Sequence, residues 1–256
     1  MIKITNTKNL TGVTVSGDYY DLEKLVDAFH EITIDEYSEK HNEYYNISIR
    51  ILGICYDIRH AMQGDREIEL VKNGMDKEKM KWHSAITPDT NVYYKCNILY
   101  PEMILFMVSS NALIKLRIND KDKSTKLYSN ALGKNVVWDE TIAVIRNFQA
   151  QFVNCVKEIL SENSFKRWLT YMNDSYSFIE DIASQYVDLI SIEYIKMNKE
   201  KRLKKFNAVT KQIACYSQFE EHLEIKEVVH KCAEKNMCEE GSVRLKGIEY
   251  PENIVW

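Results

Sequence analysis

The chain has 256 residues, of which 45% are hydrophobic and 11% aromatic, and this composition excludes an intrinsically disordered protein. Its 34 basic and 38 acidic residues give a formal net charge of −4, which excludes an overall positive field that would attract nucleic acid or anionic lipid. The longest purely apolar run, Met103 to Val108, is too short to span a bilayer, and the first residues lack the apolar core of a secretory signal. We therefore expect a cytoplasmic protein with no membrane partner.

The six cysteines are scattered, form no Cys-x-x-Cys pair and lie mostly among apolar residues. In a chain without an export signal, this pattern is typical of reduced cysteines in a core. Ile, Lys, Asn and Tyr are abundant, and their codons are rich in A and T. This bias predicts a gene from an AT-rich bacterial, phage or mobile-element genome, which concerns origin and not chemistry.

Hydrophobic periodicity and the placement of glycine and proline predict a mixture of strands and helices in the N-terminal half. Turn-forming residues 6–9 separate two short apolar runs, which predicts a β-hairpin. Gly17-Asp18 then opens a helix, and Pro101 suits the first turn of another. The predicted strands are 2–4, 10–15, 66–71 and 92–98; the predicted helices begin near residue 18 and cover 43–62 and 101–117.

The C-terminal half has no glycine or proline between Gly133 and Gly241, and its apolar residues recur at helical spacing. Residues 118–137 are predicted to form a polar connection before it. Asp139 is a predicted N-cap, and Ser217 with Glu220 matches a capping box. The predicted helices are 139–160, 165–172, 174–205 and one after Ser217, and the apolar end, Ile254–Trp256, is expected to dock on the body.

These elements predict an α+β fold, with a small, mostly antiparallel sheet and packed helices in the N-terminal half and a mainly α-helical C-terminal half. We divide the chain into an α+β subdomain, residues 1–137, and a helical subdomain, residues 138–256. The two parts can share one core.

The predicted helix 43–62 is apolar on two sides, and a helix of this kind is usually packed between layers. We therefore expect other elements to enclose it on both flanks. The first apolar arc consists of Ile47, Ile51, Ile54, Ile58 and Ala61. The second, on nearly the opposite side, consists of Tyr45, Ile49, Leu52 and Tyr56. A polar stripe runs between the arcs and includes Arg50, Gly53, Asp57 and His60.

The polar stripe offers a candidate active site. Asp57 and His60 are three residues apart on a helix, so Asp57 can orient His60 as a general base or metal ligand. Arg50 can hold an anion, and Arg66 or Glu67 adds an ionisable group at the helix exit. As an active site, Asp57, His60, Arg50 and Glu67 predict a hydrolase or nuclease-like activity. The alternative is a core helix whose polar groups pair with one another, because burial requires such pairing without any chemistry.

A second candidate site is the basic segment Lys196–Lys211, which has seven basic residues and one acidic residue. If Lys199, Arg202 and Lys205 share an open concave face, they can bind the phosphates of a nucleic acid. Alternatively, acidic residues that precede this segment on one long helix complement the helix dipole, and no ligand is needed. An acidic protein partner is a further alternative.

Two patterns resemble metal sites without meeting their requirements. Residues 120–124 begin like a calcium loop but lack its central glycine, and Ala131 stands where a bidentate glutamate is needed. Zinc-type ligands occur near the C-terminus without the usual paired spacing: His222, His230, Cys232 and Cys238. The sequence thus predicts no metal site and no cofactor.

The leading functional prediction is a non-enzymatic protein-interaction or regulatory protein, with an unidentified protein partner or self-association through a helical surface. It rests on the lack of a catalytic signature, the long helices and the 16 tyrosines, a residue type favoured at contact surfaces. The hydrolase or nuclease-like enzyme is the alternative, and nucleic-acid binding through Lys196–Lys211 is the third. The first requires an exposed apolar patch; the enzyme requires a cleft in which Asp57 and His60 are hydrogen-bonded.

Overall fold

The computed structural model describes residues 1–34, 41, 44–125, 139–173, 181–246 and 248–256. Within these residues an antiparallel sheet with helices forms the N-terminal part, and a mainly helical region follows. The predicted α+β fold class is therefore confirmed. The predicted boundary at residue 137 lies outside the described residues.

The sheet contains four antiparallel strands in the order β1-β2-β4-β3. They are β1 (Lys3–Asn6), β2 (Gly12–Gly17), β3 (Glu67–Lys72) and β4 (Thr90–Leu99). The predicted N-terminal hairpin and both later strands are confirmed. β4 is long because it pairs with two strands in succession, with β2 along its inner end and with β3 along its outer end.

Alternation along β2 and the inner end of β4 creates the core face of the sheet. Val13 lies opposite Ile98 and Val15 opposite Cys96, and all four side chains are buried. The neighbouring pair on the other face is polar, because Thr14 donates a hydrogen bond to the Asn97 side chain at 2.7 Å.

Two helices of the N-terminal half pack against each other. α1 (Tyr19–Ile32) begins at the predicted signal, since the Asp18 side chain accepts a hydrogen bond from the backbone N–H of Asp21. α2 (Tyr45–Met62) lies beside α1 and contacts β4.

The prediction that α2 is enclosed on both flanks is wrong. Its first arc is buried as predicted, from Ile47 to Ala61. On the second arc, however, Ile49 is 41% exposed and Tyr56 is 59% exposed. The pattern identified the apolar residues correctly, but single exposed apolar side chains are common on protein surfaces and do not require a covering element.

Of the two long helices that follow β4, the first is longer than predicted and the second agrees with the prediction. α4 (Tyr100–Thr125) continues past the predicted end at residue 117, so the prediction of a polar connection is wrong for residues 118–125. That segment contains no glycine or proline, and polar residues alone do not end a helix. The calcium-like residues 120–124 are therefore helical. α5 (Glu140–Ile159) begins as predicted, with Asp139 accepting a hydrogen bond from the Ile142 N–H.

The predicted single helix 174–205 is wrong, because two helices occupy this part of the chain: α7 (Asp181–Lys196) and α8 (Lys199–Ala214). Asn198 separates them, in an extended conformation, and its side chain accepts a hydrogen bond from the Lys201 N–H. Asparagine is a strong N-cap, so it ends one helix and starts the next. The predicted start at residues 174–180 lies outside the described residues.

The remaining helices are α6 (Glu162–Met172), which confirms the predicted short helix, and α9 (Glu220–Asn236). The capping-box prediction for α9 is wrong. Ser217 lies inside a 3-10 turn, Tyr216–Gln218, and the helix begins after Phe219 with no side-chain cap. The turn satisfies the local backbone instead, through the Phe219 N–H and the Tyr216 carbonyl.

One continuous core joins the sequence halves. The rings of Phe29, Phe106 and Phe148, from α1, α4 and α5, contact one another with centroids 4.8 to 5.5 Å apart. Tyr100 at the start of α4 packs against Phe206 of α8 at 4.9 Å. These contacts, with the rest of the buried cluster, place residues from both halves in one interior.

The C-terminal segment crosses the body as an extended chain. Gln185 of α7 exchanges two hydrogen bonds with it, donating to the Val243 carbonyl and accepting from the Leu245 N–H. Thr11 donates to the Val255 carbonyl at 2.6 Å, and Asn9 donates to the Trp256 carbonyl at 2.7 Å. The predicted docking of Ile254–Trp256 is confirmed.

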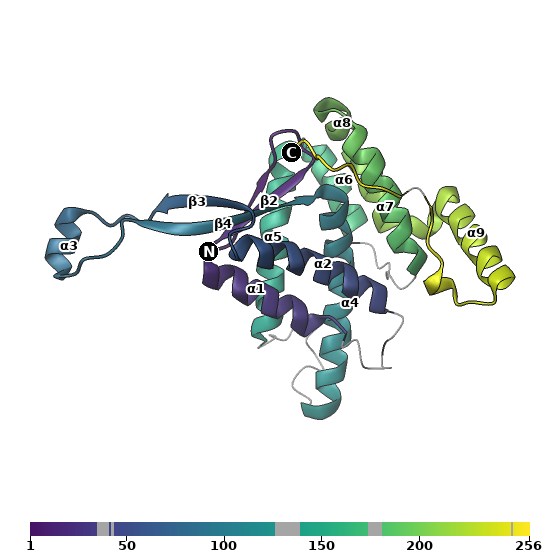
Figure 1. Ribbon diagram of the computed structural model, residues 1–256, viewed down its shortest axis with the longest axis horizontal. Coiled ribbons are helices and arrows are strands. Elements are labelled where there is room, and N and C mark those ends of the chain that lie inside the picture. Colours follow the sequence, from purple (N-terminus) through teal and green to yellow (C-terminus); the bar gives the residue numbers. More distant parts are fainter. Residues whose placement is uncertain (35–40, 42–43, 126–138, 174–180, 247) are drawn as a thin grey trace.

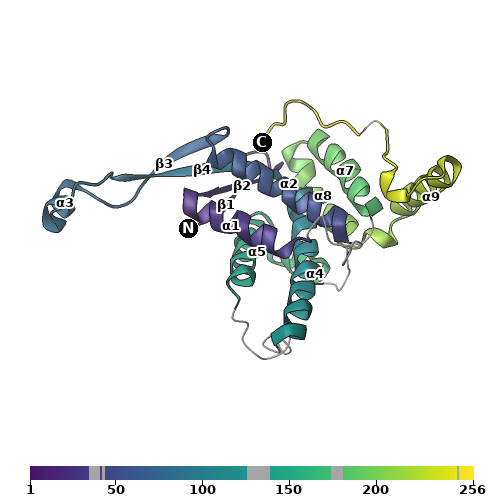
Figure 2. The same ribbon diagram turned by 60° about the horizontal axis from the view of Figure 1, so that its bottom comes forward.

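The molecule has a helical body and a long arm (Figure 1). The arm consists of β3, the outer end of β4 and a short helix at its tip, α3 (Lys77–His83), which the sequence analysis did not predict. α9 lies at the opposite end of the molecule. Figure 2 shows α4 running down through the body near α5, and the C-terminal segment passing over α7.

None of the described helices is both long and apolar enough to cross a membrane. The six cysteines form no disulfide. Cys55, Cys96, Cys155 and Cys215 are buried, as expected for core residues, whereas Cys232 is half-buried and Cys238 is exposed.

Two glycines give a paired test of this packing. A Cβ at Gly12 would lie 1.9 Å from the Ile98 carbonyl oxygen, whereas a Cβ at Gly53 of α2 would meet no atom within 4 Å. We expect Gly12→Ala to lower the free energy of unfolding by about 2 kcal/mol or more. We expect Gly53→Ala to raise it by about 1 kcal/mol through helix propensity. Denaturant unfolding of both variants measures this, and equal effects would contradict the β2–β4 spacing.

Candidate functional site

The structure gives Asp57 and His60 different partners. Asp57 accepts a hydrogen bond from Arg66 Nη2 at 3.2 Å, while His60 Nδ1 lies 2.9 Å from Asp65 Oδ2. The His60 ring also packs on Tyr56, with centroids 4.2 Å apart. Both partners come from the turn after α2, so the structure does not form the predicted Asp57–His60 pair.

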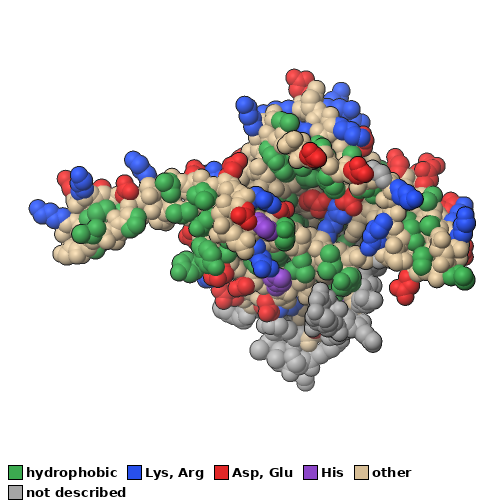
Figure 3. Space-filling view, viewed as in Figure 1, with side chains coloured by type: hydrophobic (Ala, Val, Ile, Leu, Met, Phe, Trp, Pro, Cys, Tyr) green, Lys and Arg blue, Asp and Glu red, His purple; other side chains and the backbone are tan. Residues whose placement is uncertain are grey.

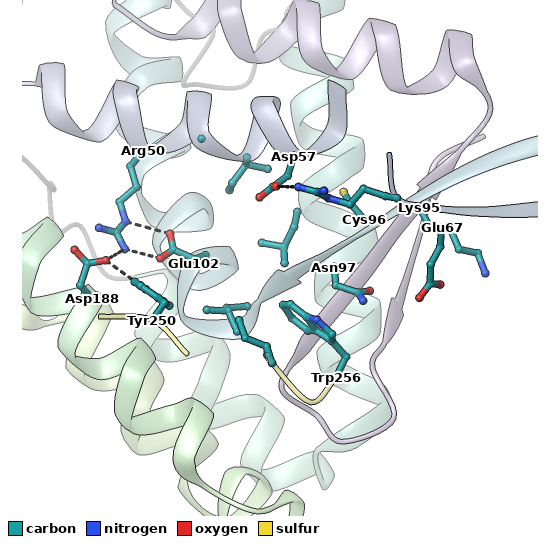
Figure 4. Close-up of a pocket in the computed structure, with 16 residues that line it drawn as sticks. Arg50, Asp57, Glu67, Lys95, Cys96, Asn97, Glu102, Asp188, Tyr250 and Trp256 are labelled. Atoms are coloured by element: carbon teal, nitrogen blue, oxygen red, sulfur yellow. Dashed lines mark hydrogen bonds and ion pairs between the residues drawn. The ribbon is translucent and has the colours of Figure 1, made fainter. Parts of the chain in front are cut away.

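A cavity of about 750 Å³ lies beside α2, between this helix, β4 and the C-terminal segment (Figure 4). Arg50, Asp57 and Glu67 of the predicted set line it, whereas His60 is not among its lining residues. In the space-filling view the region is a hollow with acidic and basic side chains at its edge (Figure 3). Three of the four predicted site residues therefore line one cavity, but the predicted Asp57–His60 hydrogen bond is not formed.

Arg50 lies at one end of the cavity and donates hydrogen bonds to three residues of two other helices. Its guanidinium donates to Glu102 of α4, with Nε 3.1 Å from Oε2, and to Asp188 of α7 at 2.7 Å. It also donates to the Ser184 carbonyl at 2.9 Å. These bonds occupy the guanidinium that was predicted to hold an anion, and they pair it with two carboxylates of the protein instead.

Electrostatics keep this arginine charged. Burial alone would lower the pKa of Arg50, but the charges and hydrogen bonds of Glu102 and Asp188 outweigh burial and raise that pKa above its ordinary value. The Tyr250 hydroxyl donates to Asp188 at 2.9 Å. Burial, together with the charges of Glu102 and Asp188, raises the pKa of Tyr250, which therefore stays protonated and a donor.

The opposite end of the cavity lies where the arm leaves the body. Asp57 pairs there with Arg66, and Lys95 pairs with Glu69 at 2.6 Å. Glu67 also lines the cavity, and in the described part of the chain its carboxylate has no hydrogen-bond or ion-pair partner. β3 pairs with β4 only as far as Lys95, so the edge of β4 from Cys96 to Leu99 faces the cavity without a partner strand.

No pattern in the sequence indicated that Glu102, Asp188, Tyr250 and Trp256 line the same cavity as Arg50 and Asp57. They come from α4, α7 and the C-terminal segment, and no spacing in the sequence relates them to α2. Glu102 lies in the first turn of α4, where an acidic residue is favoured by the helix dipole. This preference predicts a helix start and not a partner for Arg50.

The cavity thiol is a poor nucleophile. Burial raises the pKa of the Cys96 thiol to about 12, and the charge of Asp57 acts in the same direction. Burial also raises the pKa of Cys55 and of Cys155 to about 12. These thiols are therefore protonated at neutral pH and suit packing better than attack on a substrate.

The basic segment does not present the predicted face. Arg202 is only 4% exposed and donates to the carbonyls of Tyr194, Ile195 and Asn9 and to the Thr11 hydroxyl. Lys199 and Lys205 are exposed. Lys199, Arg202 and Lys205 therefore do not share the open face that nucleic-acid binding through them requires, because Arg202 connects two helices to the N-terminal hairpin. A shallow apolar groove of about 600 Å³ between α7, α8 and α9 has Lys201, Lys205 and Lys211 among its lining residues.

The described residues contain no group of three or more histidine, cysteine or acidic side chains arranged to hold a metal ion. His222 is buried, and its ring packs edge-on against Tyr186 and Tyr216. His230 lies 2.7 Å from Glu240 on the exposed side of α9. The zinc-type residues near the C-terminus thus face different environments.

The arm has no interior of its own. No residue from Gln63 to Lys95 is buried. Its large apolar side chains face solvent instead: Ile68 is 54% exposed, Leu70 66%, Trp82 80%, Ile86 99% and Val92 42%. A large exposed apolar patch of this kind is uncommon on soluble proteins and usually marks an interaction site.

The comparison with protein families matches residues 2–256 to a family described as a domain of unknown function, DUF6904. The chain belongs to the DUF6904 family. The match spans the arm, the cavity and the C-terminal segment, so all three belong to the DUF6904 domain. No curated protein and no solved structure matches the chain.

We expect removal of the Arg50 charge to lower the stability of the protein strongly, and removal of the two carboxylate charges to restore it. The side chains of Arg50, Glu102 and Asp188 are 16%, 18% and 24% exposed. Arg50→Met leaves two poorly solvated carboxylates without their cation, and we expect the free energy of unfolding to fall by about 3 kcal/mol. Adding Glu102→Gln and Asp188→Asn should recover most of it. Denaturant unfolding measures both.

The matched control is Arg66→Met, which removes the half-exposed partner of Asp57. Exposed ion pairs contribute little, so we expect a change within about 0.5 kcal/mol. A loss for Arg66→Met equal to that for Arg50→Met would contradict the special role of the buried cluster.

Thiol reactivity tests the burial of Cys96. We expect Cys232 and Cys238 of the native DUF6904 domain to react quickly with a disulfide reagent at pH 8, and the four buried cysteines to react only after unfolding. The double variant Cys232→Ser/Cys238→Ser should lose the rapid phase. A rapid phase that survives in this variant would show that a core thiol, Cys96 included, is accessible.

Proposed function

We propose that this DUF6904 protein acts by binding a protein partner through the β3–β4 arm, and not by catalysis at Asp57 and His60. The observation that carries this proposal is the apolar face of the arm. Ile68 lies opposite Tyr94 and Leu70 lies opposite Val92, so these four side chains share one face of the two-stranded ribbon.

The other face of the ribbon is polar. Glu67 lies opposite Lys95 and Glu69 opposite Tyr93, and the Glu69–Lys95 ion pair crosses it. The ribbon is therefore amphipathic although both faces meet solvent. A two-stranded ribbon is marginally stable by itself, and a partner that covers its apolar face would remove that surface from water.

Two further features support docking on the arm. The outer edge of β3 ends the sheet, so its backbone groups are available to another chain. At the tip, Trp82 and Ile86 are the most exposed large apolar residues of the arm. Tryptophan is the residue type most enriched among side chains that dominate binding energy at interfaces.

The separate partners of Asp57 and His60 support the same choice. A general base must reach the substrate. His60 pairs with Asp65 instead of Asp57, and neither His60 nor Asp65 lines the cavity. Cys96, the cavity thiol, is kept protonated by burial. Neither feature favours a hydrolase or nuclease-like reaction at this place.

Adjacent residues on opposite faces provide the experiment. A photoreactive phenylalanine analogue is placed at Leu70 on the apolar face, or at Glu69 on the polar face, of the full chain in its native host. We expect irradiation to give one discrete higher-mass product from position 70 and much less from position 69. A product of twice the mass, also formed by the purified protein, would identify the partner as a second copy.

The control separates binding from folding. Leu70→Asp changes an exposed residue, so we expect the free energy of unfolding to change by about 0.5 kcal/mol or less while crosslinking from Val92 is lost. Equal products from both faces, or none from either, would contradict docking on the apolar face.

A further inference from the structure

The Arg50 end of the cavity carries excess negative charge. Two carboxylates, Glu102 and Asp188, surround one guanidinium, so the cluster has a formal charge of −1. Asp188 Oδ1 accepts hydrogen bonds from both Arg50 and Tyr250. Among the described residues, Asp188 Oδ2 has no hydrogen-bond partner, so one acceptor is available to a ligand.

The arm end of the cavity provides a second carboxylate, that of Glu67. Arg66 neutralises Asp57, and Lys95 neutralises Glu69. Glu67 remains, with no partner in the part of the chain that the structure describes, and it lines the cavity. The two clusters come from different elements and lie at opposite ends of the cavity (Figure 4).

The wall between the two ends is mostly apolar. Figure 4 shows side chains without charge between the two clusters, and the apolar residues that line the cavity include Ile54, Ile98, Leu99 and Ile254. Gly53 adds free space, because a Cβ there would meet no atom within 4 Å. Packing does not require this glycine, whose presence within a helix reduces stability. Its effect is to leave the cavity wall open.

We infer that this cavity binds a linear aliphatic diamine, with one ammonium group at the Asp188 end, the other at the Glu67 end, and the methylene chain along the apolar wall. An ammonium group donates charge-assisted hydrogen bonds to a carboxylate, and binding removes the apolar surface of the ligand's methylene chain from water. The ring of Tyr250 beside Asp188 suits a cation as well. This site is separate from the apolar face of the arm, so the inference does not depend on the proposed function.

Matched ligands test the two-ended geometry. The full chain is titrated in low salt with α,ω-diaminoalkanes of increasing length and with n-alkylamines of the same lengths, by calorimetry and by melting temperature. We expect saturable binding at one ligand per chain and a rise in melting temperature that grows with diamine concentration. Affinity should pass through a maximum at one chain length, and the monoamine of that length should bind at least about tenfold more weakly.

Variants locate the site. Asp188→Asn and Glu67→Gln should each weaken binding of the best diamine about tenfold or more. The monoamine has one ammonium group, so at most one of the two variants should weaken its binding by a similar factor. Gly53→Leu should block binding while the chain stays folded. Asp27→Asn and Glu23→Gln, on the exposed side of α1, make the same changes in net charge and should bind as the unchanged protein does.

Three results would overturn the inference. The first is no saturable diamine binding at millimolar concentration. The second is equal affinity for diamines and monoamines of the same length. The third is binding that Asp188→Asn, Glu67→Gln and Gly53→Leu leave unchanged, which would place the ligand elsewhere.

Discussion

The guanidinium of Arg50 must be neutralised and hydrogen-bonded where it lies, and this constraint fixes three helices relative to one another. Arg50 projects from α2, Glu102 from α4 and Asp188 from α7, while α7 also provides the Ser184 carbonyl. Leaving one of these charges without its partner is far more costly than the pair is stabilising. The cluster therefore specifies the arrangement of the helices more than it contributes net stability.

Arg202 has a corresponding role on the other side of the core. Its guanidinium reaches the carbonyls that end α7 and the turn between β1 and β2. The last carbonyls of a helix have no partner within it, so an arginine from the next helix satisfies them. Two arginines that the sequence suggested for ligand binding thus join its N-terminal and C-terminal parts. The continuous aromatic core between Phe29 and Phe206 is consistent with that connection.

Local signals in the sequence predicted local structure well. Asp18 and Asp139 were identified as helix starts because an N-cap needs only a side chain and the N–H groups just after it. Asn198 was missed as an N-cap because asparagine is also tolerated inside helices, and the contacts of Arg202 with the end of α7 join distant parts of the chain. The partners of Arg50 were beyond prediction, since Glu102 and Asp188 lie 52 and 138 residues away in sequence. Periodicity on α2 identified its apolar residues but could not show which side another element covers.

The arrangement of the arm also could not be predicted from local patterns in the sequence. The arm connects the two proposed sites, the cavity and the apolar face of the ribbon. Alternation predicted β3 and β4, but a period of two cannot show that the outer end of β4 continues past β2 and pairs with β3 alone. The strand passes from body to arm at Lys95, where β3 begins opposite it with Glu67. Lys95 forms its ion pair with Glu69, two residue pairs along the ribbon, so the Glu67 carboxylate at the cavity has no ion-pair partner among the described residues. Leu70 of the apolar face follows three residues after Glu67 on the same short strand. The charge that the cavity presents and the direction in which the arm projects are therefore set by one junction.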